Sequence, residues 1–137
     1  MCQQITTLAT NDEARQIWCC EHGTIHINWE QVTVRLRPND FRRMVRLLEE
    51  GATELNFNKI CDGNLILVPQ ENGCHQVWCG NVMLLLDALA FLQLVQLARA
   101  AARQLDKPDF NNRRPRLMRK NGRDGVGYLP ESGFSTN

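Results

Sequence analysis

The hydrophobic and polar positions of this chain follow a pattern that returns after fifty residues. Apolar and polar side chains alternate over residues 24–29 and 32–37, and an apolar stripe at helical spacing follows over residues 41–48. Identical residues coincide when this stretch is shifted by fifty: Gly23 with Gly73, Val32 with Val82, Leu36 with Leu86, Phe41 with Phe91, and Val45 with Val95. A fixed internal period of this length predicts a duplicated structural unit.

In the first unit, alternation with a period of two predicts two strands with one wet face. Only Glu30-Gln31 separates them, so they should form a hairpin. Pro38 is expected to end the second strand, and Asn39 or Asp40 to cap the helix that follows. Gly51 is the expected end of that helix.

The second helix is predicted over residues 87–105, with Asp87 as its cap, and it is apolar around most of its circumference. Polar residues such as Arg99 interrupt the apolar run, which argues against a membrane span. So apolar a helix needs cover on more than one side, and a second copy of the chain is the expected cover. The predicted interface of this homo-oligomer, a dimer in the first instance, uses Leu89, Leu92 and Val95. The alternative is that the first helix and first sheet already bury these residues.

The predicted fold class is α+β, with tandem βββα (or ββα) repeats whose antiparallel hairpins pack on two helices. Residues 17–20 and 67–70 are the candidates for the additional strand of each repeat. The first eleven residues are weakly patterned and are expected to be extended or loose, and a further strand could occupy residues 54–58. Residues 1–108 should form one domain made of two repeats (about 15–51 and 65–105), followed by an extended basic tail at residues 109–137.

Charge is distributed unevenly along the chain. The 137 residues carry a net charge of +1 and 23% charged residues, which is typical of a soluble globular protein. Seven Lys/Arg but only three Asp/Glu lie from Lys107 to the end. The predicted partner-binding residues are the basic ones of the tail: Arg113, Arg114, Arg116, Arg119, Lys120 and Arg123. Such a run suits an acidic protein surface or, alternatively, nucleic-acid phosphates.

Six cysteines are present, and the first residues lack the basic start and apolar run of a secretory signal. This combination favours reduced thiols over a disulfide framework, and therefore a cytoplasmic location.

The best metal-ligand candidates are Cys19, Cys20, His22 and His26 in the first repeat and Cys74, His75 and Cys79 in the second. The predicted ligands are those that precede the two hairpins: Cys19, Cys20, His22, Cys74 and His75. If the repeats pair pseudo-symmetrically, these residues come together, and zinc requires four such ligands in a tetrahedron. However, the chain has no Cys-x-x-Cys pair, and buried thiols are the simpler interpretation of most of these cysteines.

No catalytic motif is present. Cysteine and histidine lie close in sequence, but their spacing is not one used for nucleophilic catalysis, and no glycine-rich phosphate loop stands between a strand and a helix. The leading hypothesis is a non-enzymatic interaction subunit or adaptor. It would oligomerise through its apolar helix and dock a partner with its basic tail. A small zinc-binding structural or sensor protein and a nucleic-acid-binding protein are the alternatives.

Overall fold

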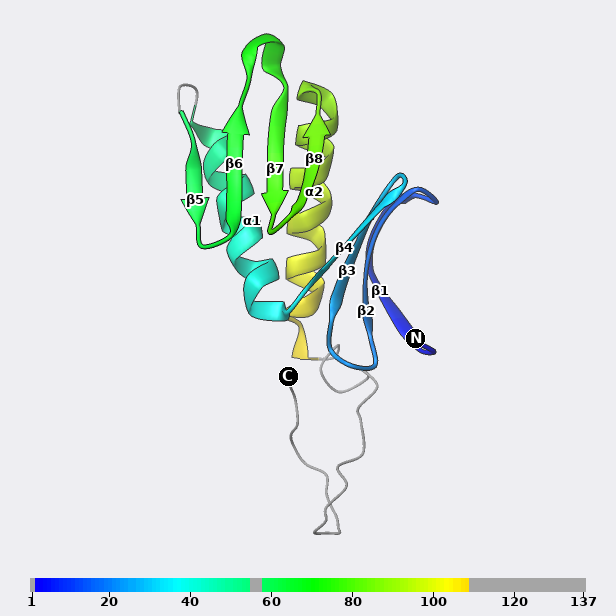
Figure 1. Cartoon of the computed structure of the whole chain (residues 1–137). Coiled ribbons are helices and arrows are strands. Elements are labelled where there is room, and N and C mark those ends of the chain that lie inside the picture. Colours follow the sequence, from blue (N-terminus) through cyan, green and yellow to red (C-terminus); the bar gives the residue numbers. More distant parts are fainter. Residues whose placement is uncertain (1, 55–57, 109–137) are drawn as a thin grey trace, which may run out of the picture.

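Each repeat folds into a four-stranded sheet followed by a helix. The computed structural model describes residues 2–54 and 58–108 (Figure 1). The first repeat contains β1 (Ile5–Asp12), β2 (Arg15–Cys20), β3 (Ile25–Trp29), β4 (Val32–Leu36) and α1 (Pro38–Thr53). The second contains β5 (Ile60–Asp62), β6 (Leu65–Pro69), a short 3-10 helix (Glu71–Gly73), β7 (His75–Cys79), β8 (Val82–Leu86) and α2 (Ala88–Leu105). The α+β class and the tandem duplication are therefore confirmed.

Both sheets have the same antiparallel order, β1-β2-β3-β4 and β5-β6-β7-β8. Their registers correspond as well, because Ile27 pairs with Val34 in the first sheet and Val77 with Leu84 in the second. The turn before each inner hairpin contains a glycine with positive φ, 86° at Gly23 and 79° at its counterpart in the second repeat. Glycine adopts that conformation without steric cost, so the repeated glycine has a structural reason.

Each repeat has one strand more than the predicted three. β1 lies where the sequence is weakly patterned, because only Leu8 of its eight residues is buried and its pairing with β2 has two irregularities. β5 has three residues, and the strand expected at 54–58 falls mostly on residues 55–57, outside the described part of the chain. A mostly exposed or very short strand cannot show the alternation on which sequence-based assignment depends.

The helix starts differ in how well they were predicted. The Asp87 carboxylate accepts a hydrogen bond from the Ala90 backbone N–H at 2.7 Å, as expected of a cap. In α1 the cap position is Arg37, without a side-chain hydrogen bond, and Pro38 opens the helix instead of merely ending the strand before it. Proline suits this first helical position because its missing N–H would have no partner there.

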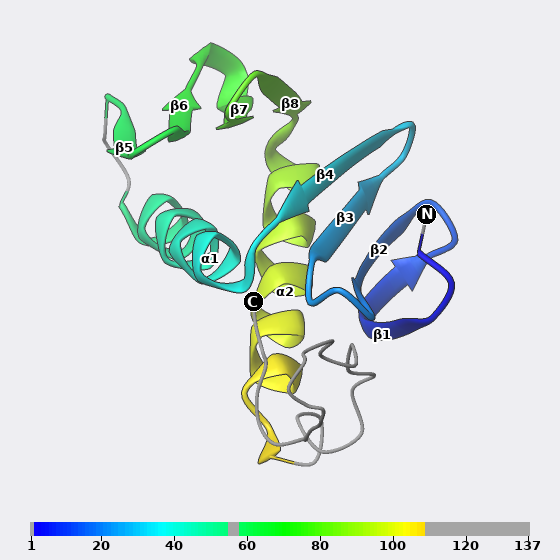
Figure 2. The same ribbon diagram turned by 60° about the horizontal axis from the view of Figure 1, so that its bottom comes forward.

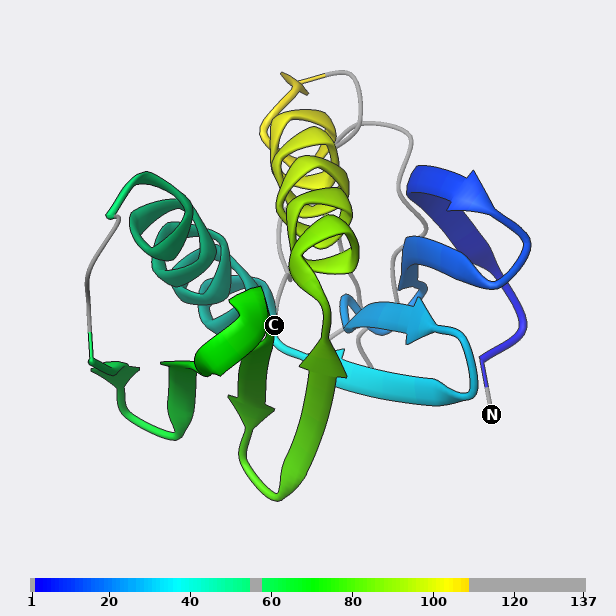
Figure 3. The same cartoon turned by 90° about the horizontal axis from the view of Figure 1, so that it is seen from above.

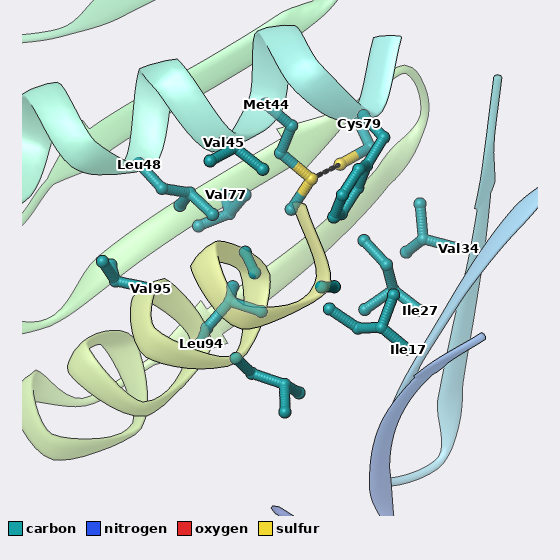
Figure 4. Packing of buried hydrophobic residues seen from close by; sticks show 14 of the residues in the cluster. Ile17, Ile27, Val34, Met44, Val45, Leu48, Val77, Cys79, Leu94 and Val95 are labelled. Atoms are coloured by element: carbon teal, nitrogen blue, oxygen red, sulfur yellow. Dashed lines mark hydrogen bonds between the residues drawn. The ribbon is translucent and has the colours of Figure 1, made fainter. Parts of the chain in front are cut away.

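Each helix covers the sheet of the other repeat. The main sheet contacts of α2 are with β1 and β2, and those of α1 are with β5 and β6. Figures 2 and 3 show α1 beside the second sheet and α2 between the two sheets. This exchange joins the repeats in one core. In Figure 4, Ile17 and Ile27 of the first sheet share that core with Val45 of α1 and Leu94 of α2. The Cys79 and Met44 sulfur atoms lie 4.0 Å apart in it.

Because of this exchange, other parts of the same chain cover much of the apolar surface of α2, for which external cover was predicted. Phe91, Leu94, Val95 and Ala98 are all buried within the chain, and Val95 is only 3% exposed. Val95 is therefore a core residue and is not at the surface where an interface was predicted. Among the described residues, no helix is both long and apolar enough to span a membrane.

Candidate metal centre

One group of potential metal ligands stands out in the described part of the chain. One ligand atom each from Cys2, Cys20, Glu21 and His22 lies within 4.8 Å of all the others. Cys20 ends β2, Glu21 and His22 form the turn before β3, and Cys2 precedes β1. Because β1 and β2 are antiparallel and Ile5 pairs with Cys20, the start of the chain lies beside this turn.

The β2–β3 turn places its two ligands on the same side. The Cys20 N–H donates to the Thr24 carbonyl at 3.1 Å, and the Gly23 N–H donates to the Cys20 carbonyl at 3.0 Å. This tight reversal depends on the positive φ of Gly23. It leaves 3.7 Å between Cys20 Sγ and His22 Nδ1.

Glu21 fastens the segment that carries Cys2. Its carboxylate accepts hydrogen bonds from the backbone N–H groups of Gln3, at 3.0 Å, and Gln4, at 3.2 Å. The Glu21 N–H in turn donates to the Gln4 carbonyl at 3.1 Å. The backbone hydrogen bond from Gln3 is the main reason that the pKa of the Glu21 carboxyl is lowered. Held in this way, Cys2 Sγ lies 3.9 Å from His22 Nδ1.

His26, on β3, approaches the same thiol from the sheet. Its Nε2 lies 3.8 Å from Cys2 Sγ. The imidazole stacks on Trp18, with ring centroids 3.8 Å apart and planes 6° from parallel, and the residue is only 4% exposed. Burial lowers the pKa of His26, and the nearby positive groups of Arg35 and His22 add to this effect. The lowered pKa favours the neutral ring, which is the form that binds metals.

The two thiols differ in acidity. Burial alone would raise the pKa of Cys20, but hydrogen bonds from Cys2, His22 and the backbone favour its thiolate and lower the pKa overall. The pKa of Cys2 is raised, first by its hydrogen bond with Cys20 and then by burial. Cys20 is therefore the first of the pair to ionise, and a thiolate is the form that binds a metal.

The remaining predicted ligands do not join this group. Cys19 points to the opposite face of the sheet, where it is completely buried and its Sγ lies 3.5 Å from the Cys20 carbonyl. His75 begins β7 and stacks on Phe91 of α2 at a centroid distance of 3.9 Å. Cys74, beside it, is likewise absent from the group. The expected pairing of the two repeats at one metal centre is thus not what the fold produces.

Comparison of the repeats explains this result. A shift of fifty residues places non-ligating side chains at the positions of Cys2, Cys20, His22 and His26: Ala52, Gln70, Asn72 and Gln76. The second repeat forms the same β6–β7 hairpin with Gln70, Asn72 and Gln76, whereas Ala52 lies at the end of α1. The backbone therefore does not require cysteine or histidine at these positions, and the first repeat alone has the ligands.

Sequence reasoning missed Cys2 and Glu21 as members of the group and did not keep His26 among the predicted ligands. The signal for Glu21 and His26 was local, because both lie within six residues of Cys20. Cys2 could be found only by pairing the start of the chain with β2, and β1 shows no clear alternation.

Cys20 lacks the accessibility that a catalytic nucleophile needs. Cys20, the more acidic thiol, is 1% exposed, so a substrate cannot reach it. A groove of about 680 Å³ lies at the opposite end of the first sheet, between the β3–β4 turn and β8, with Trp29, Val32 and Met83 in its walls. A nucleophile needs an accessible position next to its base.

Two further groups of predicted residues have different outcomes. The basic residues Arg113 to Arg123 lie outside the described residues, so their proposed contact with a partner or nucleic acid stays a prediction. Of the predicted interface, Leu89 is 67% and Leu92 is 49% exposed, and Leu85, on β8 before this helix, is 61% exposed. We call these three residues the leucine surface.

No protein-family model, no curated protein and no solved structure matches this chain. Functional inference therefore depends on the residues and their geometry.

Proposed function

We propose that this chain is a zinc-binding protein whose ion is held by Cys2, Cys20 and His22. The observation that carries the proposal is the spacing of these ligand atoms. Zinc binds thiolate sulfur at about 2.3 Å and imidazole nitrogen at about 2.0 Å, so tetrahedral geometry requires a sulfur–nitrogen separation of roughly 3.5 Å. The separations are 3.7 Å for Cys20 and His22 and 3.9 Å for Cys2 and His22. Shifts of a few tenths of an ångström suffice to bind the ion.

The chemistry of these ligands favours zinc among the common ions. Thiolate and imidazole are borderline-soft ligands that suit zinc, whereas magnesium and calcium prefer sets of oxygen ligands. The hydrogen bonds that lower the pKa of Cys20 favour its thiolate, and the ion itself promotes ionisation of Cys2. The ion would link two segments that are 20 residues apart in the chain, Cys2 and the His22 turn. Its proposed role is therefore to fix the start of the chain to the first sheet.

Zinc titration of the full chain against a chromophoric chelator tests this proposal. We expect about one tightly bound zinc per chain, and a loss of at least tenfold in affinity in Cys20→Ser and His22→Gln. Cys61→Ser is the matched control, because Cys61 is exposed on β5 and is not in the ligand group. Less than about half an equivalent of zinc in the wild type, or equal losses in the Cys61 control, would contradict a specific site.

A second candidate function is self-association through the leucine surface. The first repeat has polar residues at the three corresponding positions: Arg35, Asn39 and Arg42. The same fold is thus compatible with polar residues there, and the three leucines need another reason. Adjacent exposed apolar residues are typical of protein-interaction sites.

The repeats supply the variants for a test. The triple substitution Leu85→Arg, Leu89→Asn and Leu92→Arg transfers the residues of the first repeat to the second. We expect the wild type to sediment as a dimer at micromolar concentration and the triple variant as a monomer. The control is Gln96→Arg, which copies Arg46 at another exposed position of α2. A monomeric wild type would rule out self-association in this concentration range.

A further inference from the structure

We propose that His26 is the fourth ligand of the ion and that Glu21 is a positioning residue that holds Cys2 in place. This inference rests on the proposed zinc site and specifies how it is completed. The two residues compete for the role, because Glu21 is the fourth member of the close ligand group. His26 approaches that group through Cys2, with its Nε2 at 3.8 Å from the thiol sulfur.

The position of His26 on the sheet directs its ring toward the centre. His26 pairs with Trp18 across β2 and β3, and Cys20 lies two residues beyond Trp18 on the same strand. Residues two apart on a strand share a face, so His26 and Cys20 lie on the same face of the sheet. That face is opposite to the core face, which contains Cys19 and Ile27.

The surroundings of His26 keep its ring ready to bind. Trp18 fixes the plane of the ring by stacking, and only 4% of the residue is exposed. The Nε2 atom of the ring contacts the Cys2 sulfur. An imidazole held in this position near a thiol has the orientation that a zinc ligand requires.

Glu21 already has a different task. Each of its carboxylate oxygens accepts a backbone N–H, from Gln3 and Gln4, and these bonds hold the segment that presents Cys2. If the carboxylate turned to the ion, it would release the N–H groups that place the first thiol. Partners that orient metal ligands in this way typically contribute a factor of 10 to 100 in metal affinity.

His26 as the fourth ligand makes the coordination complete, with two thiolates and two imidazoles. Such a site is closed and has no position for substrate or reactive water, which is the arrangement of structural zinc. In the second repeat, the corresponding hairpin forms with a residue other than histidine at this position. Gln76 occupies the position that corresponds to His26, and its side-chain oxygen accepts a hydrogen bond from Trp78 Nε1 at 3.0 Å. His26→Gln therefore copies a residue that this hairpin already accommodates.

Cobalt(II) is the probe for the experiment, because its visible absorption is intense in tetrahedral sites and weak in sites with more ligands. In the full chain we expect a tetrahedral spectrum with thiolate charge-transfer bands. His26→Gln should weaken cobalt binding at least tenfold and reduce the d–d intensity as water enters the open position. Glu21→Gln should weaken binding by about tenfold with an unchanged spectrum, since a carboxamide retains one of the two acceptors.

The outcomes separate the two proposals. If Cys20→Ser weakens the thiolate bands but His26→Gln changes neither affinity nor spectrum, the assignment of His26 is wrong and the zinc site remains. If Glu21→Gln changes the shape of the spectrum, Glu21 is a ligand. If the wild type gives no thiolate bands, both proposals fail. Circular dichroism of each variant without metal verifies that it is folded.

Discussion

Removal of one thiolate from the candidate centre should reduce the effect of zinc on thermal stability by about half or more. The perturbation is Cys20→Ser, which retains a side chain of similar size but removes the more acidic thiol. Zinc joins Cys2 to the β2–β3 turn and so closes a loop of about 19 residues. That link restricts the unfolded chain as a covalent cross-link does.

Two independent arguments give the magnitude. Closing a loop of this length removes unfolded-chain entropy worth about 3 kcal/mol at 25 °C, in the loop-entropy treatment of cross-links. Mass action gives about 2.7 kcal/mol when free zinc is 100 times its dissociation constant. A domain of roughly 100 residues gains about 4 °C in Tm per kcal/mol, so the expected rise is about 10 °C.

Differential scanning calorimetry of the reduced, full chain measures this effect, with and without zinc. The wild type and the Cys61→Ser control should both show the rise, whereas zinc should raise the Tm of Cys20→Ser by about half as much or less, because a tenfold weaker site gains only about 1.4 kcal/mol at the same zinc concentration. The reasoning is refuted if zinc shifts the Tm of the wild type and of Cys20→Ser equally.

Three further predictions follow from the cysteines and His26. In the metal-free protein, one equivalent of hydrogen peroxide should oxidise the Cys2 and Cys20 thiols to a disulfide with release of two waters. Bound zinc should slow this oxidation. Intact-mass measurement detects the loss of two hydrogens. Iodoacetamide at pH 8 should modify Cys61 readily but not Cys79, because burial raises the pKa of Cys79 to about 11; peptide mapping measures the difference. The pKa of His26 is lower in the folded than in the unfolded chain. The stability that the neutral His26 ring contributes to the metal-free protein is therefore present above about pH 6.5 and is lost as the pH falls through the folded pKa. The unfolding free energy of His26→Gln should therefore fall less than that of the wild type between pH 7 and pH 5, and a comparable fall in both would contradict the burial of a neutral ring.

The duplication was the part of the fold most accessible from the sequence. Inner hairpins and helices carry their own signals, with alternation at Val32 and Val34 and helical spacing at Phe41, Met44 and Val45. A shift of fifty aligns both sets, so each repeat supports the assignment of the other. The cap at Asp87 followed from the same local reasoning.

The exchange of helices between sheets had no local signal. Each helix presents an apolar stripe, and neither stripe specifies which sheet it will contact. Without that knowledge, α2 looked too apolar for a lone chain, although β1, β2 and α1 pack against it and Val95 is buried. β1 could not be recognised in the sequence because only one of its residues, Leu8, is buried.

The candidate centre was half predictable. Cys20 and His22 are adjacent on one turn, and their proximity follows from the short reversal at Gly23. The other ligands were predicted to come from the second repeat. The fifty-residue correspondence already opposed this choice, since Gln70 and Asn72 stand at the equivalent positions. The second thiol belongs instead to Cys2, which lies beside the same turn because β1 pairs antiparallel with β2.

X-ray absorption at the zinc edge tests the central claim most directly, since it identifies the atoms bound to the ion in the full-length protein. The account predicts a mixed first shell, with sulfur at about 2.3 Å and nitrogen at about 2.0 Å, and loss of part of the sulfur signal in Cys20→Ser. A first shell of only oxygen and nitrogen, unchanged by that substitution, would contradict it.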